Sequence, residues 1–451
     1  MTRLFMVLIT LFVCVTWAVA QPLPTPTKEQ VEWADCEIGA IIHFDINVYE
    51  PKYQWRGQWD YNPDPKIFNP KKLDTDQWVK SVKAMGGEYA VLVVKHCTGF
   101  CLWPSEAHNY GIKSSLWKHG NGDILADFIE SCKKYDVRPG VYYSAAANGY
   151  FQVDNPGLVR SKDPEEQKAY NDMVEQQLTE LYSRYGKFFE IWFDGGCLPP
   201  EKGGPDIVTL LHKYQPKAVV FQGPEKTNSL IRWVGNERGV APYPCWSTTH
   251  TTTSSGGNEE IDRLHGNANG PLWCPGEADF PIRHGGWQGG WFYHPDNTRH
   301  LMSLETLLDK YYTTVGRNTN MLIGVVVDTD GLVPEVDAKR MKEFGDVIKK
   351  RFDHPIARTK GKGSNVLLKL PQPTTINQVV LAEEIVQGER VREFTVEGRV
   401  NGQWQALYQG TCIGHKHIIQ LEDTKASAVR LRVKESADTP LIRDLSVYHI
   451  Q

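Results

Sequence analysis

The seven residues from Glu190 to Gly196, EIWFDGG, place a carboxylate directly after a short apolar run and directly before two glycines. An apolar run of this kind is typical of a buried strand, so Asp194 is expected at the carboxyl end of that strand. The two glycines leave its side chain uncovered. In a parallel barrel, catalytic groups gather at the carboxyl ends of the strands. Asp194 is therefore a candidate catalytic group, and the alternative is an aspartate that caps the following helix.

Four other apolar runs also end in residues that could do chemistry. In order along the chain, these residues are His43, Asp45, His96, Asn236, Glu237, Glu277 and Asp279. A purely structural barrel has no reason to bring two imidazoles and several carboxylates to one end. Two chemistries fit this set, a divalent metal site and hydrolysis of a glycosidic bond by two carboxylates. The sequence favours the second, with no metal and no cofactor, because the candidates are scattered over separate strands and lack clustered histidine spacing.

The elements that must position these residues follow a repeating pattern. Amphipathic segments of helical period, such as 75–87, 123–136 and 165–186, lie between near-continuous apolar runs. The apolar runs are at 38–46, 88–96, 138–145, 189–195, 218–224, 231–237, 272–280 and 320–328. Eight such runs predict a (β/α)8 barrel. A doubly wound sheet would need a glycine-rich turn after its first strand, and HFDINVYEP is not such a turn.

A long irregular stretch from 240 to 300 interrupts the pattern and is rich in Gly, Thr, Ser and Trp. Loops of this length in a compact domain are usually functional or disordered, and the tryptophans favour an ordered, functional loop. The flat, amphipathic face of an aromatic ring suits the apolar face of a sugar. We therefore take Trp291 as a candidate substrate-binding residue.

The chain divides into two folded domains after an amino-terminal segment. Residues 1–20 combine Arg3, an apolar core and AVA before Gln21, which predicts a cleaved signal peptide and an exported protein. Residues 21–354 form the predicted catalytic domain, and Pro355 stops its last helix. Short alternating strands then predict an all-β sandwich over 355–451.

Composition excludes several classes of partner. The chain has 451 residues, 23% of them charged, and a formal net charge of -4 without a basic block, so nucleic acid is not expected as a partner. No run after the first twenty residues approaches a membrane span. Eight cysteines remain in the mature chain, spread too widely for a disulfide framework, and are expected to be mostly buried thiols.

The ordered motifs together resemble the α-L-fucosidases of glycoside hydrolase family 29. HFD, VKHCTGFCLWPS, GVYYS and IWFDGG follow one another as in that family, and VGRNTNMLIGVVVDTDGLV is similar to the segment that closes its barrel. The resemblance implies a retaining enzyme that acts on a fucosylated oligosaccharide or glycoconjugate. It departs at Cys97 and Thr98, where the family often has His and Asp, which puts one polar sugar contact in doubt.

The resemblance also implies roles for single residues. Asp194 is the implied nucleophile, and His43, His96 and Tyr143 are the implied ligands of fucose hydroxyls. RWVGNERG followed by CWST resembles the branch that prefers α-1,3 and α-1,4 linkages, which implies that Glu237 is the acid/base.

Glu277 is the rival for that role. If it is not the acid/base, we expect it to bind the leaving-group sugar or to pair with Arg283. Trp233, Val234 and Trp246 lie near Glu237 in sequence and are expected to give it apolar cover. Two alternatives stay open: a catalytically silent fucose- or glycan-binding protein, and a retaining barrel glycosidase for another sugar.

Overall fold

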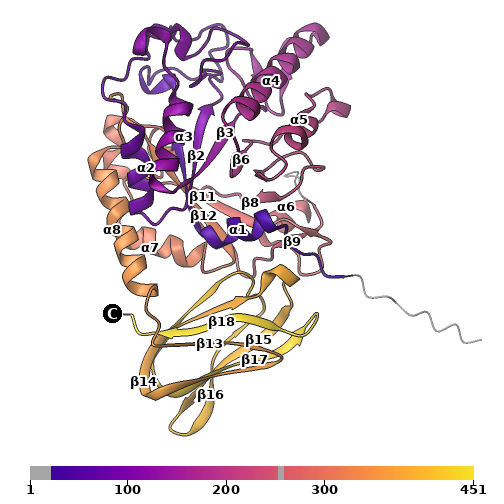
Figure 1. Ribbon diagram of the computed structural model, residues 1–451, viewed down its shortest axis with the longest axis vertical. Helices are drawn as coiled ribbons and strands as arrows, with labels where there is room; N and C mark the ends of the chain where they lie inside the picture. The colour runs from indigo at the N-terminus through magenta and orange to yellow at the C-terminus, as the bar shows by residue number, and fades with distance from the viewer. Residues whose placement is uncertain (1–21, 252–257, 451) are drawn as a thin grey trace, which may run out of the picture.

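The computed structural model in Figure 1 describes residues 22–251 and 258–450. The predicted signal peptide lies outside these residues. Within the part of the chain that is described, no helix is both long and apolar enough to cross a bilayer.

Eight parallel strands close into a barrel, which confirms the predicted fold. Going around the barrel from β1, the order is β1, β12, β11, β8, β7, β6, β3 and β2, so each strand pairs with its neighbours in chain order. The strands are β1 (Ile38–His43), β2 (Tyr89–Lys95), β3 (Arg138–Tyr143), β6 (Glu190–Trp192), β7 (Val219–Phe221), β8 (Leu230–Trp233), β11 (Gly276–Pro281) and β12 (Thr319–Val326). Each strand lies within or overlaps one of the eight apolar runs seen in the sequence.

Helices surround this barrel and alternate with most of its strands (Figure 1). They are α2 (Thr75–Ala84), α3 (Ile124–Tyr135), α4 (Pro164–Arg184), α5 (Ile207–Tyr214), α6 (Asn258–His265), α7 (Leu304–Thr313) and α8 (Glu335–Phe352). Aspartates begin several of them: the Asp74 side chain accepts from the amide of Gln77, and Asp123 accepts from Ala126. Such caps satisfy amides that the first helical turn leaves free. No helix separates β7 from β8 among the described residues, and 222–229 joins them directly.

The long stretch between β8 and β11 contains its own short elements. β9 (Thr248–Thr249) pairs with β10 (Leu272–Trp273), and α6 lies between them in sequence. A second small hairpin, β4 (Val153–Asp154) with β5 (Leu158–Val159), follows β3.

The C-terminal domain is a β-sandwich whose strands hydrogen-bond in the order β13, β18, β14, β17, β15, β16. These strands are β13 (Ala357–Lys362), β14 (Asn365–Glu383), β15 (Val391–Val400), β16 (Gln403–Gly410), β17 (His417–Ser436) and β18 (Leu441–Tyr448). Burial alternates residue by residue along the start of β14, as one-sided packing of a strand requires. β17 is the longest of these strands, with 20 residues.

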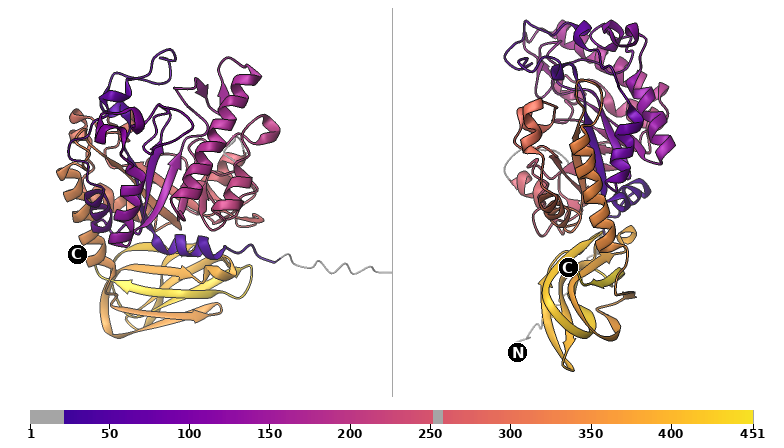
Figure 2. Two further views of the ribbon diagram at one scale, coloured as in Figure 1. Left: turned by 45° about the horizontal axis from the view of Figure 1, so that its top comes forward. Right: turned by 90° about the vertical axis from the view of Figure 1, so that its left-hand side faces the viewer.

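The sandwich packs against the end of the barrel from which the strands start (Figure 2). α1 (Lys28–Cys36), which precedes β1, lies between the two domains, and Asp35 at its end bonds to His415 and Arg443 of the sandwich at 2.8 Å each. Arg317, just before β12, forms a β-bridge with His417. The carboxyl ends of the barrel strands therefore stay free of the sandwich.

A buried carboxylate joins the two domains. Glu389 of the sandwich accepts from the backbone amide of Ser247 at 3.0 Å and from the Asn318 side chain at 2.6 Å, and it is 3% exposed. Both donors belong to the barrel domain. Removing the carboxylate would leave the buried Ser247 amide without an acceptor and would take one acceptor from the Asn318 side chain, which also donates to the Cys245 carbonyl.

We expect Glu389→Ala to lower the free energy of unfolding by about 1–3 kcal/mol, because buried donors that lose their acceptor keep their full desolvation cost. Urea denaturation followed by circular dichroism measures the change. Glu393→Ala is the matched control, since Glu393 pairs with Lys434 at the surface and should contribute at most about 1 kcal/mol. Equal losses in the two variants would contradict the role of Glu389.

Candidate active site

A cavity of about 320 Å³ opens at the carboxyl ends of β6, β7, β8 and β11. It contains the carboxylates of Asp194 and Glu237 together. The lining residues are Asn155, Trp192, Asp194, Gly195, Gln222, Trp233, Glu237, Arg263 and Asp279. The structure thus brings together the two residues that the sequence pairs as catalytic candidates.

Asp194 directly follows β6, and its position is set by a hydrogen bond to its side chain and by the turn after it. The Tyr142 hydroxyl donates to its Oδ2 at 2.8 Å. After it, Gly195 and Gly196 take φ values of 70° and 79°, the left-handed region that favours glycine. A Cβ atom at Gly195 would also lie only 2.7 Å from the side-chain amide nitrogen of Asn155. The two glycines therefore let the chain turn away and leave Asp194 facing the cavity.

Tyr142 occupies the place that the sequence assigned to Tyr143. Successive side chains of a strand point to opposite faces, so only one of the two tyrosines on β3 can face the barrel interior. The Tyr143 hydroxyl donates to Gln177 of α4 at 2.7 Å, fully buried between barrel and helix. Contrary to the prediction, Tyr143 therefore points away from the site.

His43 and His96 stand beside Tyr142. The His96 ring stacks on it, with centroids 5.6 Å apart, and the His43 ring lies 6.3 Å away. Burial, together with the neighbouring His96, lowers the pKa of His43 to about 3, and burial also lowers the pKa of His96. Both rings are therefore neutral near pH 7. His96 can donate to one hydroxyl and accept from another, whereas His43 Nδ1 lies 3.4 Å from the Ile41 carbonyl, which leaves its Nε2 for a hydroxyl. His96 Nδ1 is buried with no partner among the described residues.

Glu237 lies on the loop after β8 and is held by Trp291. The Trp291 indole N–H donates to its Oε2 at 3.1 Å, and the Trp291 ring lies 5.0 Å from that of His43. Glu237 has a φ of 48°, an unusual conformation for a residue other than glycine and one that is often found at functional sites. Its side chain is exposed. Trp246 does not give the expected cover, because it packs under the Arg392 guanidinium at 4.9 Å.

Glu277 lies below the cavity, not in it. Its side chain is fully buried in the barrel, where it accepts from Tyr89 at 2.6 Å and from the Trp192 indole at 2.9 Å. Arg283, its other expected partner, pairs with Asp337 at 2.8 Å. Contrary to the prediction, Glu277 is therefore not placed to contact a substrate.

Asp279 is the carboxyl group of β11 that does line the cavity. Trp233 donates to its Oδ1 at 2.8 Å. Burial raises the pKa of Asp279 to about 8, and the nearby charge of Glu237 adds to that effect. Asp279 is therefore mostly protonated near pH 7, and Asp194 and Glu237 are the other two carboxyl groups that line the cavity.

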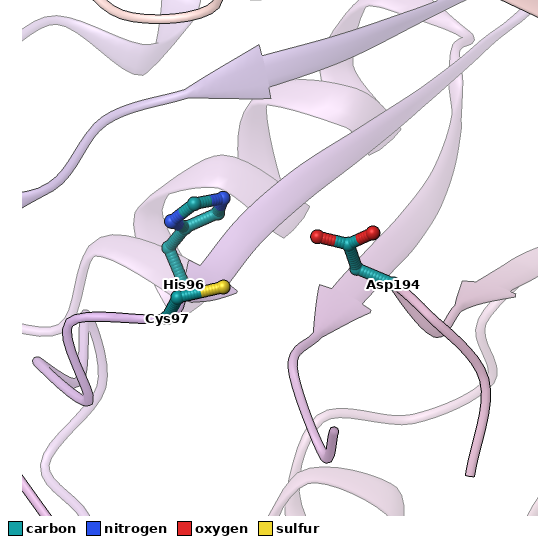
Figure 3. A group of neighbouring side chains, drawn as sticks. All are labelled: His96, Cys97 and Asp194. Atoms are coloured by element: carbon teal, nitrogen blue, oxygen red, sulfur yellow. The ribbon is translucent and has the colours of Figure 1, made fainter. Parts of the chain in front are cut away.

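Figure 3 shows His96, Cys97 and Asp194 facing one another at the ends of β2 and β6. Their nitrogen, sulfur and carboxylate ligand atoms all lie within 4.8 Å of one another. Imidazole, thiolate and carboxylate groups are the usual protein ligands of a zinc ion. Catalysis without a metal, as the sequence predicts, remains a prediction. All eight cysteines of the described chain are free, and seven are buried.

Several lining residues escaped the sequence reasoning. Asn155 and Gln222 come from connections between strands and Arg263 from α6, and their place in the cavity depends on the tertiary fold. The sequence could have indicated Tyr142, because strand alternation allows only one member of the Tyr142–Tyr143 pair to face inward. The arrangement as a whole, two carboxylates among aromatic rings and neutral histidines, suits hydrolysis of a glycosidic bond.

Known proteins similar to this chain point the same way. The sequence profile of the α-L-fucosidase family matches residues 19–263. Alpha-L-fucosidase 1 of Arabidopsis thaliana is 31% identical over 470 residues, which covers 94% of this chain and 88% of the plant protein.

Solved structures agree with this match. A Bacteroides thetaiotaomicron protein assigned as an α-L-fucosidase superposes with a TM-score of 0.90 at 38% identity, over 95% of this chain and all of the other. A family 29 fucosidase of Ruminococcus gnavus, crystallised with fucose, gives a TM-score of 0.81 at 25% identity over 95% of each chain. The chain described here belongs to the α-L-fucosidase family of glycoside hydrolases.

Proposed function

We propose that this chain is an exported, retaining α-L-fucosidase that releases terminal α-1,3- or α-1,4-linked L-fucose from glycans. The observation that carries the proposal is that Asp194 and Glu237 line one cavity at the catalytic end of the barrel. The fucose-bound structure of the Ruminococcus gnavus relative supports fucose as the sugar.

The two carboxylates have different surroundings, which suits two different roles. Tyr142 binds Oδ2 of Asp194 and leaves Oδ1 free to attack the anomeric carbon. As the C1–Oδ1 bond forms, the glycosidic C–O bond breaks and Glu237 donates a proton to the departing oxygen. Glu237 then removes a proton from water, which attacks C1 and releases Asp194. This double displacement requires carboxylates about 5–5.5 Å apart.

The remaining groups suit the binding of a neutral deoxy sugar. The neutral rings of His43 and His96 offer donors and acceptors to sugar hydroxyls. Trp291 lies beside His43 and offers an aromatic face. Aromatic faces and a few placed polar groups are the usual composition of such sites.

Linkage preference and export rest on separate observations. Glu237 is exposed on its loop, so the leaving-group side of the cavity has room for a branched glycan. The resemblance of RWVGNERG to the branch that prefers α-1,3 and α-1,4 linkages supports the same choice. Export rests on the amino-terminal sequence alone.

Asp194→Asn should abolish nearly all fucosidase activity without loss of folding, because an amide cannot attack the anomeric carbon. In the wild-type enzyme, a 2-deoxy-2-fluoro fucosyl fluoride should form a stable adduct, which peptide mass mapping locates. An adduct on any residue other than Asp194 would refute the assignment of the nucleophile.

Tyr142→Phe should lower kcat/KM for a nitrophenyl fucoside by about 10- to 100-fold, since a hydrogen bond to a charged group contributes about 1.5–3 kcal/mol. Tyr143→Phe is the matched control on the same strand and should lower thermal stability with little change in kcat/KM. If Tyr143→Phe lost more activity than Tyr142→Phe, the strand register described here would be contradicted.

Glu237→Ala should slow a Lewis-type trisaccharide by about 10²–10⁴-fold, and an aryl fucoside with an acidic phenol much less, because a good leaving group departs without a proton. Azide should restore turnover of the aryl fucoside and give the α-fucosyl azide by opening the covalent intermediate. Glu277→Ala is the control and should slow both substrates alike, without rescue. Leaving-group dependence and rescue in Glu277→Ala alone would exchange the two roles.

A further inference from the structure

Two carboxyl groups meet in the interior of the barrel, beneath the catalytic cavity. Glu190, at the start of β6, and Glu277, on β11, are both fully buried, and their side chains are within hydrogen-bonding reach of each other. One oxygen of Glu190 accepts from the Trp33 indole at 3.1 Å, while the other has no donor among the described residues. A proton on that second oxygen lets Glu190 donate to Glu277 and removes the unsatisfied atom.

Among the described residues, the groups that hydrogen-bond to the pair are neutral donors, and Asp279, the next carboxyl group along β11, has a pKa raised to about 8. Tyr89 and Trp192 donate to Glu277, and Trp33 donates to Glu190. Two negative charges at this position would repel each other in a dry interior, so one proton must remain. Burial, then the charge of Glu277, raises the pKa of Glu190 well above its ordinary value. Burial raises the pKa of Glu277 to about 7, against three hydrogen bonds that lower it. Near neutral pH the proton therefore resides on Glu190.

The pair connects to the nucleophile through two aromatic rings. Glu277 fixes the Trp192 ring by accepting its indole N–H at 2.9 Å. The Trp192 ring lies between Phe221, 3.8 Å away by ring centroids, and Tyr142, 5.4 Å away, and is nearly parallel to both. Tyr142 donates directly to Asp194. The orientation of Asp194 thus depends on a ring that Glu277 holds in place.

We propose that Glu190 and Glu277 are a positioning pair that shares one proton, with Glu277 anchoring Trp192 and, through Trp192 and Tyr142, setting the orientation of Asp194. This inference rests on the proposed function of Asp194. Neither glutamate touches the substrate or the reacting atoms.

The two glutamates should respond differently to the same substitution. In Glu190→Gln, the amide oxygen can still accept from Trp33 and the amide N–H can still donate to Glu277, as the protonated carboxyl does. In Glu277→Gln, the side chain loses one acceptor oxygen and cannot satisfy Tyr89, Trp192 and Glu190 together. We expect kcat for a nitrophenyl fucoside to fall at least about tenfold further in Glu277→Gln than in Glu190→Gln, with little change in KM.

Glu383→Gln is the matched control for burial alone. Glu383 is a buried carboxyl of the sandwich that accepts from three backbone amides, those of Arg390, Val391 and Gly414, and burial raises its pKa to about 7 as well. Its substitution should lower the melting temperature and leave kcat close to that of the wild type. If Glu277→Gln behaves as Glu383→Gln does, losing stability but not kcat, the positioning role is refuted. Equal losses of kcat in Glu190→Gln and Glu277→Gln would refute the assignment of the proton.

A signal from Trp192 itself separates this inference from the proposed function. In ¹⁵N-tryptophan-labelled enzyme, the Trp192 Nε1–H resonance, assigned by its loss in Trp192→Phe, should move strongly in Glu277→Gln and little in Glu190→Gln, because only the first change alters the acceptor of that N–H. This measurement needs no turnover, so it remains decisive if no fucoside is hydrolysed. A resonance that moves as far in Glu190→Gln as in Glu277→Gln would overturn the proposal.

The pH dependence of stability gives a second test, and the direction of the change is predicted. Both folded-state pKa values lie above those of the unfolded chain, so the pair stabilises the fold fully below about pH 4.5 and loses that contribution as the pH rises through 7 and beyond. The melting temperature should therefore fall on the alkaline side, and less steeply in Glu190→Gln. A slope as steep in Glu190→Gln as in the wild type would contradict the buried proton.

Discussion

The site depends on one constraint, the strict alternation of side chains along the strands of a closed parallel barrel. Alternation turns Tyr142 and Trp192 inward on β3 and β6 and leaves Tyr143 to the helices outside. It also aligns the inward residues in layers, with Glu277 beneath Trp192 and Asp194 above it. A slip of one residue in β3 would exchange the two tyrosines and leave the nucleophile without its hydrogen bond.

Burial sets the protonation of several groups at the site. His43 and His96 are kept neutral by burial, and Asp279 is kept protonated near pH 7 by the same cause. The neutral side chains of Tyr142 and His96 lie beside Asp194, which suits an uncharged ligand such as a sugar. The Glu190–Glu277 pair extends this arrangement into the interior, where neutral donors and one retained proton replace a counter-ion.

Much of the fold could be predicted from the sequence because hydrophobic periodicity is a local property. Eight apolar runs coincide with eight barrel strands, and Asp194 lies at a strand end as its glycine neighbours indicate. Side-chain direction was harder to predict. The resemblance implied Tyr143, because a motif does not state which of two adjacent tyrosines faces inward, whereas Tyr142 is the one that faces the site. Glu277 was expected at the carboxyl end of its strand, because an apolar run does not show where a strand stops. In the structure, β11 begins at Gly276, so Glu277 lies near its start.

The surroundings of Glu237 were the least predictable part. Its neighbours in sequence were expected to cover it, yet Trp291, 54 residues away, binds it and Trp246 packs against the sandwich instead. Contacts of this kind depend on how a long loop returns to the barrel, which no local pattern states. Asn155, between β4 and β5, and Gln222, directly after β7, also line the cavity, and no local pattern predicts that they do.

The central claim is that Asp194 attacks the anomeric carbon directly, with Glu237 as its partner across the cavity. The configuration of the first-formed product tests it, by proton NMR of the anomeric signals during early hydrolysis of a nitrophenyl α-L-fucoside and before mutarotation. Two displacements at one carbon predict that α-L-fucose appears first and that the β-anomer accumulates only later. Initial release of β-L-fucose would mean a single displacement by water, and would contradict Asp194 as the nucleophile.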